Sequence, residues 1–414
     1  MRGTEWVACA ALLLNGCANT TFNVPPGAAD EQLYATIFPY YVEFCALSEI
    51  RKLPGTEVDI EGGGPGGHTV LYLNGVCRVK DAGYPVIQVC DGAPQLNQGV
   101  GLSVNAHYRN ANWTATEGRD FFFHGDQRPG EPLTLASYAR TQARARALGV
   151  LDGVQFHASV MRDKPAALSA VDYMYELSAA TDYAIGFGRD RYCARVPVDR
   201  ARMAGVVTYL NGVNAPYRGG ARVFEWDVLR DNCAHLTHNA LATVGLWRNW
   251  PTERPLLIAA FDFPVPKNEF VNLMRRTNDL PIDDPASVYD NEELRTALLR
   301  QDWIATRPGA LAEAERAIPD NAMYDTRLRL IFFDEAILGH YQQRFEQIFA
   351  DPRYTDLRAN LAHFGALYDH IMASRPAAGE DPRRTAFDAL YYDHIAHERA
   401  ALDTVRARLA RIPG

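Results

Sequence analysis

The chain has 414 residues, of which 47% are hydrophobic and 22% are charged, and its formal net charge is −8. These proportions are those of a folded globular protein of roughly two or three domains, and they exclude a disordered chain. The net charge is negative and the basic residues are scattered along the chain, which argues against nucleic acid as a partner.

The beginning of the chain has the layout of a secretory signal. Arg2 precedes an apolar run at residues 6–14, which is too short to span a bilayer. The sequence LNGC at residues 14–17 resembles a bacterial lipobox, whose cysteine is lipidated after cleavage. We therefore expect a signal peptide over residues 1–17, a lipoprotein leader with its membrane anchor on Cys17, and a location in the periplasm or at the outer membrane. The alternative is a soluble protein whose first apolar run packs as a helix.

The cysteines indicate an oxidising compartment with one thiol left over. Cys9 and Cys17 belong to the predicted leader, so five of the seven cysteines remain. Four of these can pair in three ways, which the sequence does not distinguish. The five are Cys45, Cys77, Cys90, Cys193 and Cys233. The first four lie in apolar segments with strand or helix character, and Cys233 alone has the setting of a reactive thiol.

The first half of the chain is predicted to build an antiparallel sheet. Residues 18–55 are expected to be an N-terminal segment with one helix, because residues 31–52 carry apolar side chains at helical spacing. The glycine-rich sequence EGGGPGGH then leads into a strand on which His68, Val70, Tyr72 and Asn74 share one side. Residues 85–90, 100–107 and the sequence RDFFFHG continue the strand-like pattern.

The remainder of the chain alternates and then becomes helical. A helical insertion is predicted over about residues 133–180, followed by the strand RDRYCARVPV, a helix, and the strand ARVFEWDVL, which leads to the cysteine. Residues 285–414 are rich in Ala, Arg, Leu and Glu without strand pattern, which predicts an all-α C-terminal domain.

The sequence DNCAHLTHNALATVGLW at residues 231–247 places Cys233 at the start of an amphipathic helix. A helix N-terminus offers free backbone N–H groups and a partial positive charge, which favour a thiolate and can hold an oxyanion. His235 cannot serve as the base, because positions i and i+2 of a helix point about 200° apart. His68 follows a glycine loop at the start of a strand, and it is the predicted general base.

The motifs in this order resemble a known family. GGHTVLYLNG, then RDRYCARVPV, a helix, a strand and LRDNCAHLTHNAL are similar to the Lnb N-terminal periplasmic domain family. That family lies within the permuted NlpC-type papain-like group, which includes lecithin retinol acyltransferase. The resemblance spans about residues 56–246. It implies an α+β fold with a permuted papain-like domain at residues 56–265, and it makes Cys233 the nucleophile and His68 the base.

The third member of the site is predicted to be Asn105. Ser103, Asn105 and His107 share one side of a strand, and any of them could hold the second ring nitrogen of His68. The resulting interpretation is an exported thiol hydrolase or acyltransferase that cleaves an amide, ester or thioester, without a cofactor or metal. Its substrate would be a peptidoglycan peptide or a lipid acyl group of the cell envelope.

Two alternatives remain open at this point. The first is a non-enzymatic envelope lipoprotein that uses the same fold as an interaction scaffold. The second is a metal site built from His235 and His238, or from His394 and His397, since both pairs lie at helical spacing i and i+3.

Overall fold

The computed structural model describes residues 17–19, 31–53, 61–62, 67–92, 94–261, 264–300, 304–327, 331–333, 340–375 and 382–412. Residues 1–16 of the predicted leader and residues 63–66 of the glycine-rich loop lie outside the described residues.

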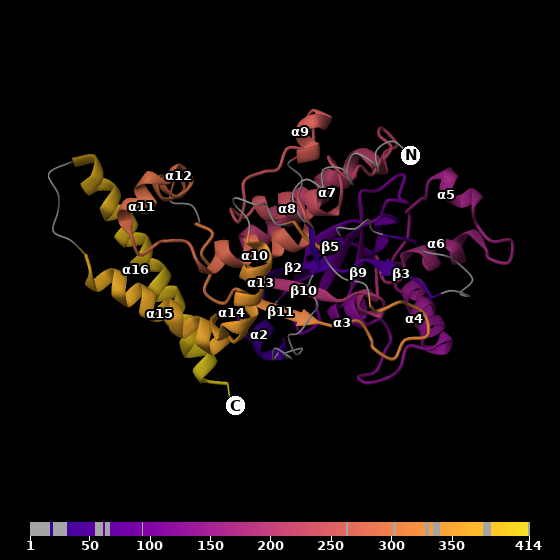
Figure 1. The fold of residues 1–414 in the computed structure, drawn as a ribbon, viewed down its shortest axis with the longest axis horizontal. Coiled ribbons are helices and arrows are strands. Elements are labelled where there is room, and N and C mark those ends of the chain that lie inside the picture. The colour runs from indigo at the N-terminus through magenta and orange to yellow at the C-terminus, as the bar shows by residue number, and fades with distance from the viewer. Residues whose placement is uncertain are drawn as a thin grey trace.

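A six-stranded antiparallel sheet forms the centre of the molecule, as Figure 1 shows. The strands follow the spatial order β11, β10, β2, β5, β8, β9. Their bounds are β2 Tyr41–Leu47, β5 His68–Asn74, β8 Gly99–Val104, β9 Trp113–Glu117, β10 Arg191–Pro197 and β11 Leu311–Glu315. The fold is therefore α+β with an antiparallel sheet, as the sequence predicts.

Three short antiparallel pairs accompany this sheet. They are β1 Cys17–Asn19 with β12 Ile331–Phe333, β3 Ile50–Arg51 with β4 Glu61–Gly62, and β6 Val76–Arg78 with β7 Ile87–Val89. The described part of the chain also has two short 3-10 helices, η1 Lys80–Ala82 and η2 Ile185–Phe187.

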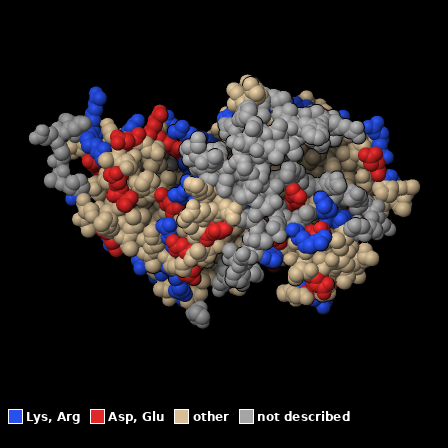
Figure 2. Space-filling model, viewed as in Figure 1, with Lys and Arg blue, Asp and Glu red and all other residues tan. Residues whose placement is uncertain are grey.

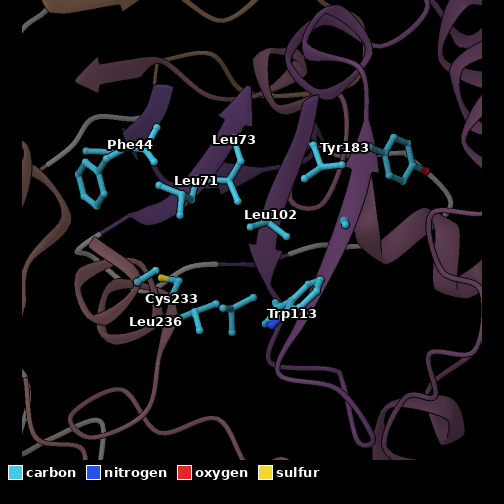
Figure 3. Close-up of a cluster of buried hydrophobic side chains, with 14 of the residues drawn as sticks. Phe44, Leu71, Leu73, Leu102, Trp113, Tyr183, Cys233 and Leu236 are labelled. Carbon is cyan, nitrogen blue, oxygen red and sulfur yellow. The ribbon is translucent and has the colours of Figure 1, made fainter. Parts of the chain in front are cut away.

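The two faces of β5 enter different hydrophobic clusters, which confirms the predicted alternation. Leu71 and Leu73 belong to the cluster that contains Leu236 of helix α8 (Cys233–Ala242). Val70 and Tyr72 belong to the cluster that contains Phe122 and Phe123 of helix α3 (Arg119–His124). Figure 3 shows the first cluster, with Cys233 and Leu236 below the strands that carry Leu71 and Leu102.

Helices lie at both ends of the sheet, as Figure 1 shows. The predicted insertion is helical and consists of α4 Leu135–Ala147, α5 Ala158–Arg162 and α6 Ala170–Ser178. Helix α7 Arg200–Arg218 follows β10. At the other end lie α11 Pro285–Asp290, α12 Glu292–Leu299, α15 Leu357–Ala373 and α16 Pro382–Ala410. The remaining helices are α2 Glu31–Ile37, α9 Leu256–Phe261, α10 Pro266–Asn278, α13 Tyr341–Ala350 and α14 Pro352–Thr355.

The C-terminal helices pack through aromatic and aliphatic side chains. Phe364 of α15 and Tyr391 and Ile395 of α16 are buried in the same cluster as Ile37 of α2. Acidic and basic side chains are interspersed over this part of the face seen in Figure 2. None of the helices in the described ranges is both long and apolar enough to cross a bilayer.

The single helix predicted over residues 31–52 is wrong. Helix α2 ends at Ile37, just before Pro39, and residues 41–47 form β2 in the middle of the sheet. Proline cannot supply a backbone N–H to a continuing helix, and Tyr41, Val42 and Phe44 suit a strand. Glu43 of β2 is fully buried, because Arg119 donates to both of its carboxylate oxygens at 2.9 and 3.0 Å.

Three further segments differ from the prediction. The sequence RDFFFHG forms helix α3 instead of a strand, and residues 221–229 form a loop instead of a strand. The region 285–414 is not all helical, because β11 joins the edge of the main sheet and β12 pairs with β1. Residues Glu313 and Glu315 of β11 make ion pairs with Arg195 and Arg191 of β10, and this tertiary pairing overrides the helical preference of Ala and Glu.

Candidate active site around Cys233

Asn232 fixes the start of the helix that carries the cysteine. Its backbone is extended, and its side-chain oxygen accepts hydrogen bonds from the backbone N–H groups of Ala234 at 2.8 Å and His235 at 3.2 Å. Its amide nitrogen donates to the Val228 carbonyl at 2.6 Å. Asparagine is a favoured N-cap residue because it satisfies these otherwise unpaired donors. The cap therefore places Cys233 in the first turn of α8, as the sequence predicts.

Cys233 is the free cysteine among those whose side chains the structure describes, which do not include Cys17. Disulfides join Cys45 to Cys193, between β2 and β10, and Cys77 to Cys90, between β6 and the end of β7. The Cys233 side chain is buried, with 7% of its surface exposed. The prediction that one thiol remains outside the disulfides, and that this thiol is Cys233, is confirmed within the described residues.

The sulfur of Cys233 faces several groups that favour its ionised form. Burial raises the pKa of the thiol, and hydrogen bonds from the Thr69 side chain and the Thr69 backbone oppose that effect. The positive charge of Arg189 and the backbone of Ala234 also lower this pKa. Thr69 is held in place by the Thr237 hydroxyl, which donates to the Thr69 hydroxyl at 3.2 Å. In the resting structure burial has the larger effect, so the thiol is protonated at neutral pH.

His68 is the first residue of β5 and is buried, with 6% of its surface exposed. Its Nε2 atom lies 3.0 Å from the Ser103 hydroxyl, which donates to the Thr181 carbonyl at 2.8 Å. Because the Ser103 proton goes to that carbonyl, Nε2 is the N–H donor and Nδ1 is the nitrogen left to accept a proton. Burial, followed by the charge of Arg189, lowers the pKa of the ring well below its usual value. The imidazole is therefore neutral at neutral pH.

Ser103, and not Asn105, contacts the His68 ring. The Asn105 amide nitrogen donates to the Asp182 carboxylate at 2.9 Å, and its oxygen accepts from the backbone N–H of His107 at 3.0 Å. Asp182 follows Thr181 directly, so Ser103 and Asn105 both attach the end of β8 to the same turn. Asn105 therefore does not make the predicted contact with the His68 ring, and it binds Asp182 instead.

The imidazole and the thiol lie at the same end of β5 but on its two different faces. Thr69 contacts Cys233 on the face of β5 that α8 covers. The preceding residue, His68, points to the opposite face, where it contacts Ser103, the strand partner of Val70. Within the described part of the chain, the structure gives no hydrogen bond between the two side chains. His68 and Cys233 are therefore close to the same residue, Thr69, without being hydrogen-bonded to each other.

Arg189 is a member of the site that sequence analysis missed. It precedes β10, is 1% exposed, and influences both Cys233 and His68 electrostatically. Its guanidinium donates to two backbone carbonyls, those of Ala180 and Ser48. Arginine is usually a surface residue, and the surrounding sequence GRDRY gives no sign that this one is buried.

The histidine pair of α8 is not arranged to bind a metal ion. Both ring nitrogens of His238 are engaged, Nδ1 with Glu269 at 2.6 Å and Nε2 with the Arg248 carbonyl at 2.9 Å. His235 is buried with neither ring nitrogen hydrogen-bonded, beside Trp250. Glu43, Cys45 and Cys193 gather in one place, but the disulfide between these cysteines removes the thiolates that a metal would need.

Comparison with known proteins returned no matching family model, no matching curated protein and no matching solved structure.

Proposed function

We propose that the chain is a cysteine hydrolase or acyltransferase in which Cys233 attacks an amide, ester or thioester carbonyl. One observation carries the proposal: the free thiol lies in the first turn of α8, with hydrogen bonds from Thr69 and Ala234 and the charge of Arg189 acting on its sulfur. A helix N-terminus and a nearby cation are both environments that activate cysteine nucleophiles.

The proposed reaction proceeds through an acyl-enzyme. The Cys233 sulfur forms a bond to the carbonyl carbon, and its proton passes to the base. The carbonyl π electrons move onto the oxygen, and backbone N–H groups at the start of α8 are suited to hold that oxyanion. Collapse expels the leaving group, which takes up the proton, and leaves a thioester on Cys233. Water or another acceptor then attacks the thioester and regenerates the thiol.

His68 is the proposed base, with Nδ1 as the accepting atom. Because Nε2 contacts Ser103 and the ring lies on the face of β5 opposite the thiol, the end of β5 must move for Nδ1 to reach Cys233. His68 is the first residue of β5, where it pairs with Leu47 of β2. Ser103 is accordingly the proposed third member of the site, in place of Asn105.

The substrate class and the location rest on the sequence resemblance. The order of the glycine-histidine and asparagine-cysteine motifs supports a permuted papain-like domain of the Lnb N-terminal periplasmic type. The two disulfides are consistent with an oxidising compartment. We therefore propose that the substrate is a peptidoglycan peptide or a lipid acyl group of the cell envelope. We also propose that the enzyme is periplasmic and that a lipid on Cys17 anchors it to the outer membrane.

A non-enzymatic scaffold is the second candidate, and one observation favours it. Cys233 is buried, with 7% of its surface exposed, and it has no hydrogen bond to His68 among the described residues. Under this alternative, Cys233 is a small core residue, and the C-terminal helices supply the contact surface.

Thiol labelling separates the two candidates. The non-reduced protein is treated with iodoacetamide across pH and mapped by tryptic digestion, for the wild type and for His68→Ala, Ser103→Ala and Asn105→Ala. We expect Cys233 to be the labelled cysteine, with slower labelling in His68→Ala and a smaller effect in Ser103→Ala. Asn105→Ala is the matched control on the same strand face and should resemble the wild type.

Two outcomes count against the proposal. Labelling of Cys233 that appears only after denaturation, in every variant, would establish the scaffold. An effect of Asn105→Ala that exceeds that of Ser103→Ala would return the third position to Asn105.

A further inference from the structure

Arg189 differs from three other buried arginines in the described part of the chain. Arg119, Arg191 and Arg195 are buried to a similar degree, and each makes an ion pair with a glutamate. Arg189 is 1% exposed, donates through Nε to the Ala180 carbonyl at 2.9 Å, and donates through Nη1 to the Ser48 carbonyl. No carboxylate in the described ranges forms an ion pair with it.

A buried cation without a counter-ion is costly, because the protein interior solvates charge poorly. Two backbone carbonyl groups supply dipoles but no negative charge. This cost falls when an anion forms nearby. The groups around Arg189 are therefore the candidates for its counter-ion. The residues whose charge it feels are Cys233, Tyr324, Asp182 and Glu49, with Cys233 first.

The carboxyl groups in this set are poor partners. Asp182 is fully buried, and burial raises its pKa, as it does for Glu49. The Asp182 carboxylate accepts a hydrogen bond from Asn105 instead of from Arg189. Tyr324 is neutral, since burial raises its pKa far above the physiological range. Neither carboxyl group forms an ion pair with Arg189 among the described residues, and Cys233, the first of the four, is the free thiol at the start of α8.

The backbone also links Arg189 to the base. The carbonyl of Ala180 accepts from Arg189, and the carbonyl of the next residue, Thr181, accepts from Ser103, which contacts His68. Ala180 has a left-handed backbone conformation with φ of 58°, which is strained for a residue with a side chain. The carbonyls of Ala180 and Thr181 in this turn therefore accept hydrogen bonds from Arg189 and Ser103, respectively.

We propose that Arg189 is the buried counter-charge of the Cys233 thiolate. On activation the S–H bond of Cys233 breaks, the electron pair stays on sulfur, and the proton passes through His68 to the leaving group. Arg189 stabilises that thiolate and at the same time disfavours a charged His68. The active form is then a thiolate beside a neutral imidazole, in contrast to a thiolate–imidazolium pair. This inference rests on the proposed function and adds the residue that makes the buried thiol reactive.

The first experiment titrates the thiolate. Ultraviolet absorbance of the thiolate and iodoacetamide labelling of Cys233 are followed against pH in the wild type, Arg189→Gln and Arg189→Lys. Gln can still donate to a backbone carbonyl but carries no charge, and Lys keeps the charge. We expect the thiol pKa to rise by about one unit or more in Arg189→Gln, which is about tenfold less thiolate at a given lower pH. Arg189→Lys should stay closer to the wild type, and Arg195→Lys is a matched control away from the thiol.

The outcomes separate the two proposals. If Cys233 titrates in the wild type and its pKa is unchanged in Arg189→Gln, the role of Arg189 is refuted while the nucleophile stands. If Cys233 never reacts in the folded wild type, the proposed function itself fails.

A second measurement leaves Arg189 in place, in case its variants do not fold. Cys233→Asp and Cys233→Asn differ only in a negative charge beside Arg189. The control pair Glu292→Asp and Glu292→Asn makes the same change at the first position of α12, whose N-cap Asn291 accepts the same two backbone N–H bonds as Asn232. We expect a larger gain in Tm from Asn to Asp at position 233 than at position 292. A gain at position 233 that is equal or smaller would show that Arg189 does not support an anion there.

Discussion

Removal of each disulfide provides a test of how the sheet supports the site. The Cys45–Cys193 bridge spans 148 residues and joins β2 to β10, and the Cys77–Cys90 bridge spans 13 residues. In the chain-entropy model, a disulfide destabilises the unfolded state in proportion to the logarithm of the loop it closes. That relation gives about 5 kcal/mol for the long loop and about 3 kcal/mol for the short one.

The assay compares Cys45→Ala/Cys193→Ala with Cys77→Ala/Cys90→Ala in denaturant unfolding. Both are made in a Cys233→Ala background, because a free thiol exchanges with disulfides in the unfolded state. We expect the first pair to lose about 2 kcal/mol more than the second. Cys45 and Cys193 are fully buried, so the lost packing acts in the same direction.

The long bridge also bears on the site. Ser48 follows β2, and Arg189 precedes β10, and the backbone N–H of Ser48 donates to the Asp190 carbonyl at 2.9 Å. Loosening the two strands should therefore disturb the Arg189 position as well as stability. Equal losses for the two pairs, or a greater loss from the short loop, would refute the reasoning.

Two further predictions follow from residues beside Cys233. Asn232→Ala should lower the free energy of unfolding by about 1 kcal/mol and should change the labelling rate of Cys233. Asn291→Ala removes the same kind of cap from α12 and should have a similar cost without altering that rate. Equal labelling rates in the two variants would show that the Asn232 cap does not affect the thiol. Burial and the charge of His238 lower the pKa of His235 to about 4, against 6.5 in the unfolded chain. The neutral ring stabilises the fold fully above pH 6.5, and roughly 3 kcal/mol is lost as the pH falls toward 4. His235→Phe should flatten the dependence of unfolding free energy on pH in that range, and an unchanged slope would contradict the assignment.

The sequence predicts the parts of the fold that depend on local periodicity. The alternation of β5 and the helical insertion at residues 133–180 are visible in the pattern of apolar side chains, and the structure confirms both. The local pattern of β2 does not predict a strand, because its buried charge, Glu43, is compensated by Arg119, which lies 76 residues away. The pattern of β11 fails for the same reason, since its glutamates pair with arginines of β10. Ion pairs between distant residues leave no local pattern.

The site was predictable to a similar extent. A cysteine behind an N-cap residue is a local feature, so Cys233 could be identified, and the spare thiol followed from cysteine counting. The choice between Ser103 and Asn105 depends on strand register and on the turn at Thr181, which the sequence does not reveal. Arg189 and Thr69 enter the site only through the packing of β10 and β5 against α8.

The charges around Cys233 decide which proton transfer the site favours. Burial alone would keep both the thiol and the imidazole neutral, because it raises the pKa of Cys233 and lowers the pKa of His68. The cation at Arg189 opposes burial at the thiol and reinforces it at the imidazole. Proton transfer from sulfur to His68 therefore produces one ion that Arg189 stabilises and one that it destabilises. In the proposed mechanism, His68 therefore passes the proton on to the leaving group and does not store it. Activation of Cys233 would then depend on Arg189 for its charge and on His68 for the route of the proton.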